Sequence, residues 1–147
     1  MQPEAFVSRH LAYRLSVWAL GMFSLGVMVF AAQRHWLGVD GLAGWPWVRA
    51  SLPSFAHTYA IALLGCVWLA QSWRQALHIG LACAALDLGL EALQHAALHD
   101  WLGSPAWARS WLVSTFDTGD LAAIMLGLCA AWCSLAWGRH LQDESKP

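Results

Sequence analysis

Four long apolar stretches constrain this chain more than any other feature of its sequence. They run over residues 15–32, 55–70, 77–98 and 121–138, and each approaches the roughly 20 residues that a helix needs to cross a bilayer. The composition agrees, because 59% of the 147 residues are hydrophobic and only 12% are charged, whereas soluble chains carry about 25% charged residues. The sequence therefore predicts a single all-α domain, residues 1–147, that forms an integral membrane bundle of four transmembrane helices.

With their flanking residues, the four helices are expected at about 14–33, 54–72, 77–98 and 118–138. The third is the least apolar because it contains Asp87 and Glu91, but its length and its Ala, Leu and Gly content favour a span. The first stretch also has the position of a signal peptide. Its apolar run is longer than the ~7–15 residues usual for a signal peptide, which favours a helix that stays in the membrane.

The basic residues predict the orientation, because they are more frequent in cytoplasmic loops. With the N-terminus inside, the inner segments hold Arg9, Arg14, Arg74, Arg139 and Lys146, and the outer segments hold Arg34, Arg49 and Arg109. Five against three favours both termini in the cytoplasm. The outer connections, 33–54 and 99–118, are rich in the tryptophan that anchors membrane boundaries.

Charge and cysteine placement exclude some functions. The net charge is −1, so nucleic acid is not an expected partner. Cys66, Cys83, Cys129 and Cys133 all fall in apolar runs, where they are expected to pack as small hydrophobic residues. No further ligands lie beside them in the sequence, and we predict neither a metal nor another cofactor.

The third stretch carries a polar face that an apolar helix would not need. Asp87, Glu91, Gln94 and His95 follow helical spacing and share one side, away from Leu86. An acidic side chain in mid-bilayer costs about 2.5–3.5 kcal/mol or more. We therefore expect this face to look into the bundle, toward polar partners on other helices.

The direction in which each helix crosses the membrane places such partners at the same depth. If the third helix runs outward, the second and fourth begin near its outer end, the second with His57 and the fourth with Asp117 and Asp120. The candidate site residues predicted in the outer leaflet are Glu91, Asp120, Gln94, His57, Asp87 and Asp117. Structural roles compete with function here, because Asp117 can cap a helix, Gln94 can hold helices together, and His57 can be an interfacial hydrogen-bonding residue.

In these residues the chain resembles the VanZ-like family of small bacterial membrane proteins. That family's pattern is a histidine among aromatic residues opening one helix, Glu-x-x-Gln on the next, and a later helix that opens with Asp followed by Asn and Gly. The matching residues are His57 with Phe55 and Tyr59, Glu91 with Gln94, and Asp120 with Gly127. Arg109 corresponds loosely to an arginine often found before the aspartate.

The resemblance covers residues 53–127, about half the chain, and departs from the pattern at Ile124, where the family usually has asparagine. It implies a four-helix, multi-pass protein of the bacterial plasma (inner) membrane. The family is named for a glycopeptide (teicoplanin) resistance protein. The missing asparagine puts the transfer of a site in doubt, and the resemblance implies no particular chemistry.

Two functions follow as hypotheses. The first is a non-enzymatic VanZ-like protein whose cluster binds an envelope or lipid component, or a membrane protein partner. The alternative is an intramembrane hydrolase-type enzyme, in which His57 acts as general base with Glu91 or Asp120, with or without a divalent metal. A haem held by His57 and His95 is less favoured, because His95 lies beside a carboxylate-rich face and no second histidine pair supports the motif. Proton translocation is also less favoured, since the inner half of the bundle holds few polar residues.

Overall fold

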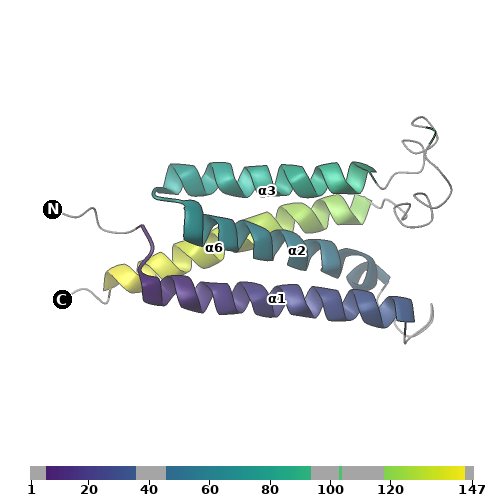
Figure 1. Ribbon diagram of the computed structural model, residues 1–147, viewed down its shortest axis with the longest axis horizontal. Helices are drawn as coiled ribbons and strands as arrows, with labels where there is room; N and C mark the ends of the chain where they lie inside the picture. The colour runs from purple at the N-terminus through teal and green to yellow at the C-terminus, as the bar shows by residue number, and fades with distance from the viewer. Residues whose placement is uncertain (1–5, 36–45, 94–102, 104–117, 145–147) are drawn as a thin grey trace.

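The computed structural model describes residues 6–35, 46–93, 103 and 118–144, which form four helices and no strand. The helices are α1 (Arg9–His35), α2 (Pro46–Leu69), α3 (Trp73–Leu93) and α6 (Thr118–Glu144). They lie side by side along one long axis, and α1 begins at the end of the bundle where α6 ends (Figure 1). The predicted all-α class is confirmed.

Three of the helices are long and apolar enough to cross a membrane. These candidate spans are Arg9–Ala32 in α1, Ser51–Leu69 in α2 and Gly119–Glu144 in α6. Large apolar side chains cover much of their outer surface, including Trp18 and Met28, each 67% exposed. Because an apolar surface of this extent is unfavourable in water, these helices indicate a membrane protein.

Three of the helices are longer than the sequence suggests. α1 runs from Arg9 to His35 rather than over 14–33, α2 from Pro46 to Leu69 rather than over 54–72, and α6 continues to Glu144 rather than 138. α3 begins at Trp73 rather than at residue 77. The Gly- and Pro-rich segment 33–54 was expected to be a loop throughout. Proline is tolerated at the first helical position, and α2 also contains Pro53, as membrane helices often do.

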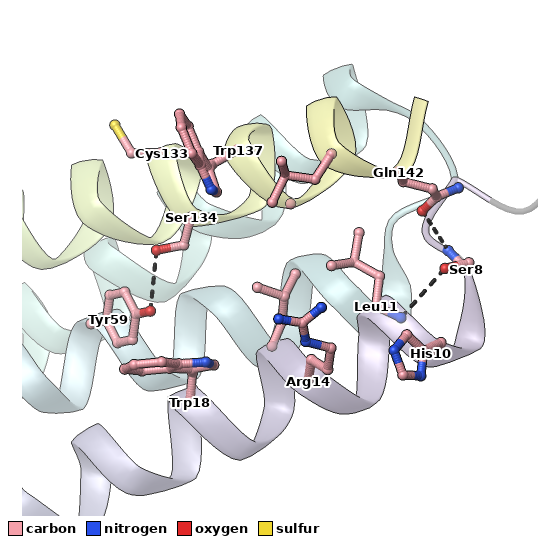
Figure 2. A pocket seen from close by; sticks show the side chains of 13 residues that line it. Ser8, His10, Leu11, Arg14, Trp18, Tyr59, Cys133, Ser134, Trp137 and Gln142 are labelled. Carbon is pink, nitrogen blue, oxygen red and sulfur yellow. Dashed lines mark hydrogen bonds between the residues drawn. The ribbon is translucent and has the colours of Figure 1, made fainter. Parts of the chain in front are cut away.

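α2 is the central helix. It packs along α1, α6 and α3, whereas α1 and α6 meet only sparsely. Just before α1 begins, the backbone N–H of Ser8 donates to Oε1 of Gln142 on α6 at 3.1 Å (Figure 2). The central position of α2 is reflected in its surface, because an almost continuous face of the helix is buried, including Ala60, Leu63 and Val67.

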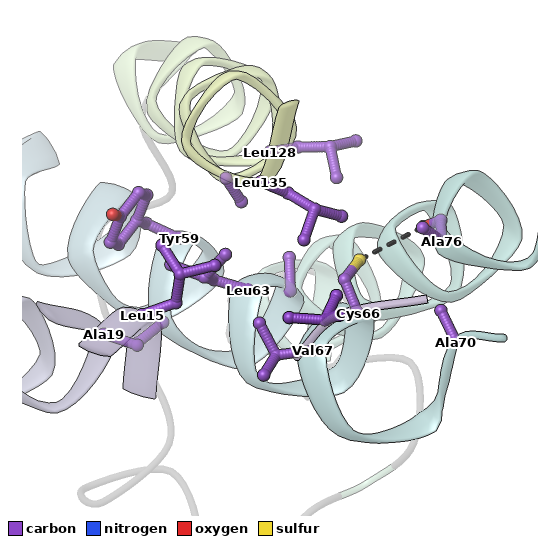
Figure 3. Packing of buried hydrophobic residues seen from close by; sticks show 14 of the residues in the cluster. Leu15, Ala19, Tyr59, Leu63, Cys66, Val67, Ala70, Ala76, Leu128 and Leu135 are labelled. Carbon is purple, nitrogen blue, oxygen red and sulfur yellow. Dashed lines mark hydrogen bonds between the residues drawn. The ribbon is translucent and has the colours of Figure 1, made fainter. Parts of the chain in front are cut away.

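The apolar core lies between α2 and its neighbours (Figure 3). Leu63, Leu128 and Leu135 are fully buried there. Cys66 belongs to the same core and donates through Sγ to the Ala76 carbonyl at 3.2 Å, so it packs as a small hydrophobic residue. All four cysteines are free, and Cys129 and Cys133 are exposed.

Glycines let α1 and α6 approach α2 from two sides. A Cβ on Gly127 of α6 would lie 2.6 Å from the Phe55 carbonyl oxygen and 3.1 Å from the Tyr59 nitrogen. On α1, a Cβ on Gly26 would lie 2.8 Å from the Ala56 Cβ. Such small-residue contacts are how helices pack closely in membranes, because dispersion contacts there replace the hydrophobic effect.

Replacing Gly127 should therefore destabilise the bundle. We expect Gly127→Ala to lower the free energy of unfolding by about 1–3 kcal/mol, because the new methyl group meets backbone atoms that have little room to move. Thermal unfolding in detergent measures the change. Gly89→Ala is the matched control, since a Cβ there would meet nothing within 4 Å; equal midpoints for the two variants would contradict the close α2–α6 contact.

Candidate functional site

Polar side chains from three helices meet inside the otherwise apolar bundle. They are Ser54, His57 and Thr58 on α2, Asp87 and Glu91 on α3, and Asp120 on α6. We call these six residues the polar cluster. Its two aspartates are buried, with 6% of Asp87 and 7% of Asp120 exposed, and Thr58 is completely buried. Buried groups of this kind are stable only with hydrogen-bond partners.

One half of the polar cluster surrounds the Asp87 carboxyl. Nδ1 of His57 lies 3.0 Å from Oδ1, and the Thr58 hydroxyl donates to Oδ2. Both oxygens of Asp87 therefore have a partner on α2. The Phe23 ring of α1 also packs near the imidazole, with 5.8 Å between ring centroids, so α1 contributes to the surroundings of the histidine.

The other half of the polar cluster lies around the Ser54 hydroxyl. Its Oγ lies 3.1 Å from Oδ1 of Asp120 and 3.4 Å from Oε1 of Glu91. A hydroxyl has one proton to donate, so Ser54 can serve only one of these two carboxyl oxygens at a time. Thr58 Oγ1 lies 3.0 Å from the Ser54 carbonyl oxygen as well, so the two halves adjoin at Thr58, whose single proton can go to this carbonyl or to Asp87.

Helical spacing explains why these residues meet. On α2, Ser54, His57 and Thr58 are three and four residues apart, which places them on one face. On α3, Asp87 and Glu91 are four apart and turn toward α2, while Leu86 and Leu90 are 68% and 51% exposed. The polar face of the third helix looks into the bundle, as its spacing predicts.

The structure brings together four of the six residues singled out from the sequence: His57, Asp87, Glu91 and Asp120. The direct partner of His57 is Asp87, whereas Glu91 and Asp120 were the partners expected for it. The reason is the start of α2 at Pro46, which places His57 about three turns inside the helix instead of at its first turn. Gln94 and Asp117 lie outside the described residues, so their roles stay predictions.

Ser54 and Thr58 were not singled out from the sequence, although they make the contacts that connect the polar cluster. Hydroxyl residues are common in membrane helices and often bond to their own backbone, so they carry little signal alone. The indication that the sequence does contain is their spacing, which places Ser54 and Thr58 on the same helical face as His57. Ile124, where the resembled family has asparagine, is fully buried in the apolar core and adds no polar group.

The arrangement offers hydrogen-bond donors and acceptors and not a metal ligand set. Within the described ranges, no three His, Cys, Asp or Glu side chains are grouped so that they could hold a metal ion. A haem site would also need His95, which lies outside those ranges. What the described residues can do is bind a polar group through Glu91 and Ser54, and orient the imidazole of His57 through Asp87.

Comparison of the chain with protein-family models, with curated proteins and with solved structures finds no match in any of the three. The resemblance to the VanZ-like family therefore rests on the quoted residues alone. The function has to be argued from the polar cluster itself.

Thr58 should be a major stabilising residue of the polar cluster. We expect Thr58→Val to lower the free energy of unfolding by about 1–3 kcal/mol, because a buried carboxyl oxygen of Asp87 loses its donor while the side-chain shape is kept. Thr58→Ser restores the hydroxyl and should stay closer to the parent protein. Thermal unfolding in detergent distinguishes them, and a valine variant as stable as the serine variant would contradict the role assigned to the hydroxyl.

Proposed function

We propose that this protein is a VanZ-like membrane protein that binds an envelope or lipid component, or a membrane protein partner, through the polar cluster. The observation that carries the proposal is the meeting of Glu91 and Asp120 at the single hydroxyl of Ser54. Ser54 can donate to only one of these two carboxyl groups at a time, so the half-buried Glu91 is suited to receive a further donor from a ligand.

The energetic argument is the cost of acidic groups in an apolar bundle. Each acidic side chain at membrane depth costs about 2.5–3.5 kcal/mol or more, and the polar cluster holds three of them. Asp87 is matched by His57 and Thr58. Glu91 is only half buried and lies near the end of α3, where a hydroxyl or amide of a bound head group can reach it.

α3 supplies the fourth span in this proposal. Its 21 residues correspond to a length of about 31 Å at 1.5 Å per residue, which matches the ~30 Å apolar thickness of a bilayer. Its acidic residues face α2 rather than lipid, so their charge does not prevent insertion. Four spans place the beginning of α1 and the end of α6 on the same side.

The proposed location is the bacterial plasma membrane, with both termini cytoplasmic. Arg9 and Arg14 near the start of α1, Arg74 near the start of α3 and Arg139 near the end of α6 belong to one end of the bundle. Basic residues favour the cytoplasmic side. The polar cluster, which lies toward the opposite end, then sits in the outer leaflet.

The function is tested by lipid binding. We expect native mass spectrometry of the purified protein, mixed with a bacterial polar lipid extract, to show a bound envelope lipid. Glu91→Gln should weaken this binding about tenfold or more, since an NH2 group replaces one of the carboxyl oxygens that can accept a hydrogen bond from the ligand. Glu144→Gln is the matched control, because Glu144 is exposed and its partner among the described residues is His140, one turn away.

Equal binding by the Glu91→Gln and Glu144→Gln variants would remove the polar cluster as the binding site. Unchanged thermal unfolding of Glu91→Gln is the accompanying check that the variant is folded. Absence of any bound envelope lipid from the parent protein would leave the protein-partner form of the proposal, which co-purification with and without Glu91→Gln then decides.

One observation favours the enzyme as a second candidate. The contact between His57 Nδ1 and Asp87 is the arrangement in which a carboxylate orients a histidine that acts as general base through its other nitrogen. In this reading Asp87, not Glu91 or Asp120, is the orienting acid. Incubation with the same lipid mixture distinguishes the binding protein from the enzyme. An enzyme releases cleaved lipid products, and these should be absent with His57→Gln.

The topology has its own test. We expect alkaline phosphatase to be inactive when fused after residue 72, between α2 and α3, and active when fused after Gly103, beyond α3, because the enzyme folds only outside the cytoplasm. A fusion after Glu144 should again be inactive. Equal activity after residue 72 and after Gly103 would show that α3 does not cross the membrane.

A further inference from the structure

A second site lies at the end of the bundle away from the polar cluster. A groove of about 800 Å³ runs between the first half of α1 and the last part of α6, with Tyr59 of α2 at its base. Its volume is in the range of ligand pockets, about 300–1,000 Å³. It exists because α1 and α6 both pack on α2 but meet each other only sparsely.

The groove changes character along its length (Figure 2). At the end of the bundle it is lined by polar side chains, among them Ser8, His10 and Gln142. Deeper in, the walls become aromatic, with Trp18 on α1 and Trp137 on α6. These two tryptophans are 67% and 65% exposed, so the deeper part opens on the outer, apolar side of the bundle and not toward its core.

A positively charged side chain lies between the polar and the aromatic parts of the groove. Arg14 lines the groove and is exposed, and in the described part of the chain no carboxylate pairs with it. Two other charged groups near this end of α6 have partners within the protein: the Arg139 guanidinium lies 4.2 Å above the Phe6 ring, and Glu144 pairs with His140 at 3.4 Å. The groove therefore offers one positive charge to a ligand.

We propose that this groove binds an anionic phospholipid from the leaflet that surrounds the beginning of α1. The phosphate lies on the Arg14 guanidinium, whose planar donors suit a phosphate, and one acyl chain lies along Trp18 and Trp137. A polar end, a cation and an apolar channel follow one another in the order in which a phospholipid presents its head group, phosphate and tail.

The position of the groove selects a lipid over a soluble anion. α1 is a candidate span, so the open side of the groove between Trp18 and Trp137 faces the apolar layer. Basic pockets between membrane helices on the cytoplasmic side are suited to anionic head groups. The site is separate from the polar cluster, since none of the residues that line the groove belongs to that cluster.

Native mass spectrometry with defined lipids tests the proposal. The full-length protein in detergent is titrated with phosphatidylglycerol and, separately, with phosphatidylcholine of the same acyl chains. We expect phosphatidylglycerol to bind about tenfold more tightly, and Arg14→Gln to abolish this preference. Trp137→Ala should weaken binding of both lipids, since it removes one wall of the acyl channel and leaves the cation.

Arg74→Gln is the matched control, because it removes an exposed charge from the same end of the bundle at a residue that does not line the groove. Glu91→Gln should keep the preference for phosphatidylglycerol, which separates this site from the polar cluster. An equal loss in Arg14→Gln and Arg74→Gln would overturn the proposal in favour of attraction by net charge. So would equal binding of the two lipids by the parent protein, or displacement of phosphatidylglycerol by inorganic phosphate.

Discussion

The burial of carboxyl groups among apolar helices is the constraint on which the rest of this structure depends. Asp87 and Asp120 are almost inaccessible, and an unmatched acidic group in such surroundings is costly. The matching groups reach them from α2, through His57 and Thr58 for Asp87 and through Ser54 for Asp120. Because α3 and α6 both depend on this one helix, α2 has to lie between them.

Short side chains make this network sensitive to the spacing between helices. Serine and threonine hydroxyls extend only slightly beyond the backbone, so they reach a carboxyl group on another helix only where the two backbones are close. Gly127 provides that closeness beside the Phe55 carbonyl, within one turn of both Ser54 and Thr58. Apolar packing and polar contacts are therefore interdependent here, since filling the glycine contact would also lengthen the hydrogen bonds.

The sequence predicts the helical class, the inward-facing side of α3 and the residues on it, because long apolar runs and the spacing of Asp87 and Glu91 are strong signals. It does not predict where α2 begins, because Pro46 and the glycines before it resemble a loop until the tertiary structure extends the helix. That difference decides which carboxylate meets His57. The hydroxyls of the polar cluster are also missed, since Ser54 and Thr58 differ from other helical serines and threonines only by their neighbours.

The connection between α2 and α3 consists of residues 70–72, and this brevity bears on how the chain enters a membrane. Two helices joined so closely emerge from synthesis nearly together and can insert as a hairpin. Asp87 then meets His57 and Thr58 while both helices are still entering, and it does not wait for α6. The helix that carries two acidic residues on its inner face would thus enter the membrane together with the helix that supplies their partners, and only the contact of Ser54 with Asp120 would wait for α6.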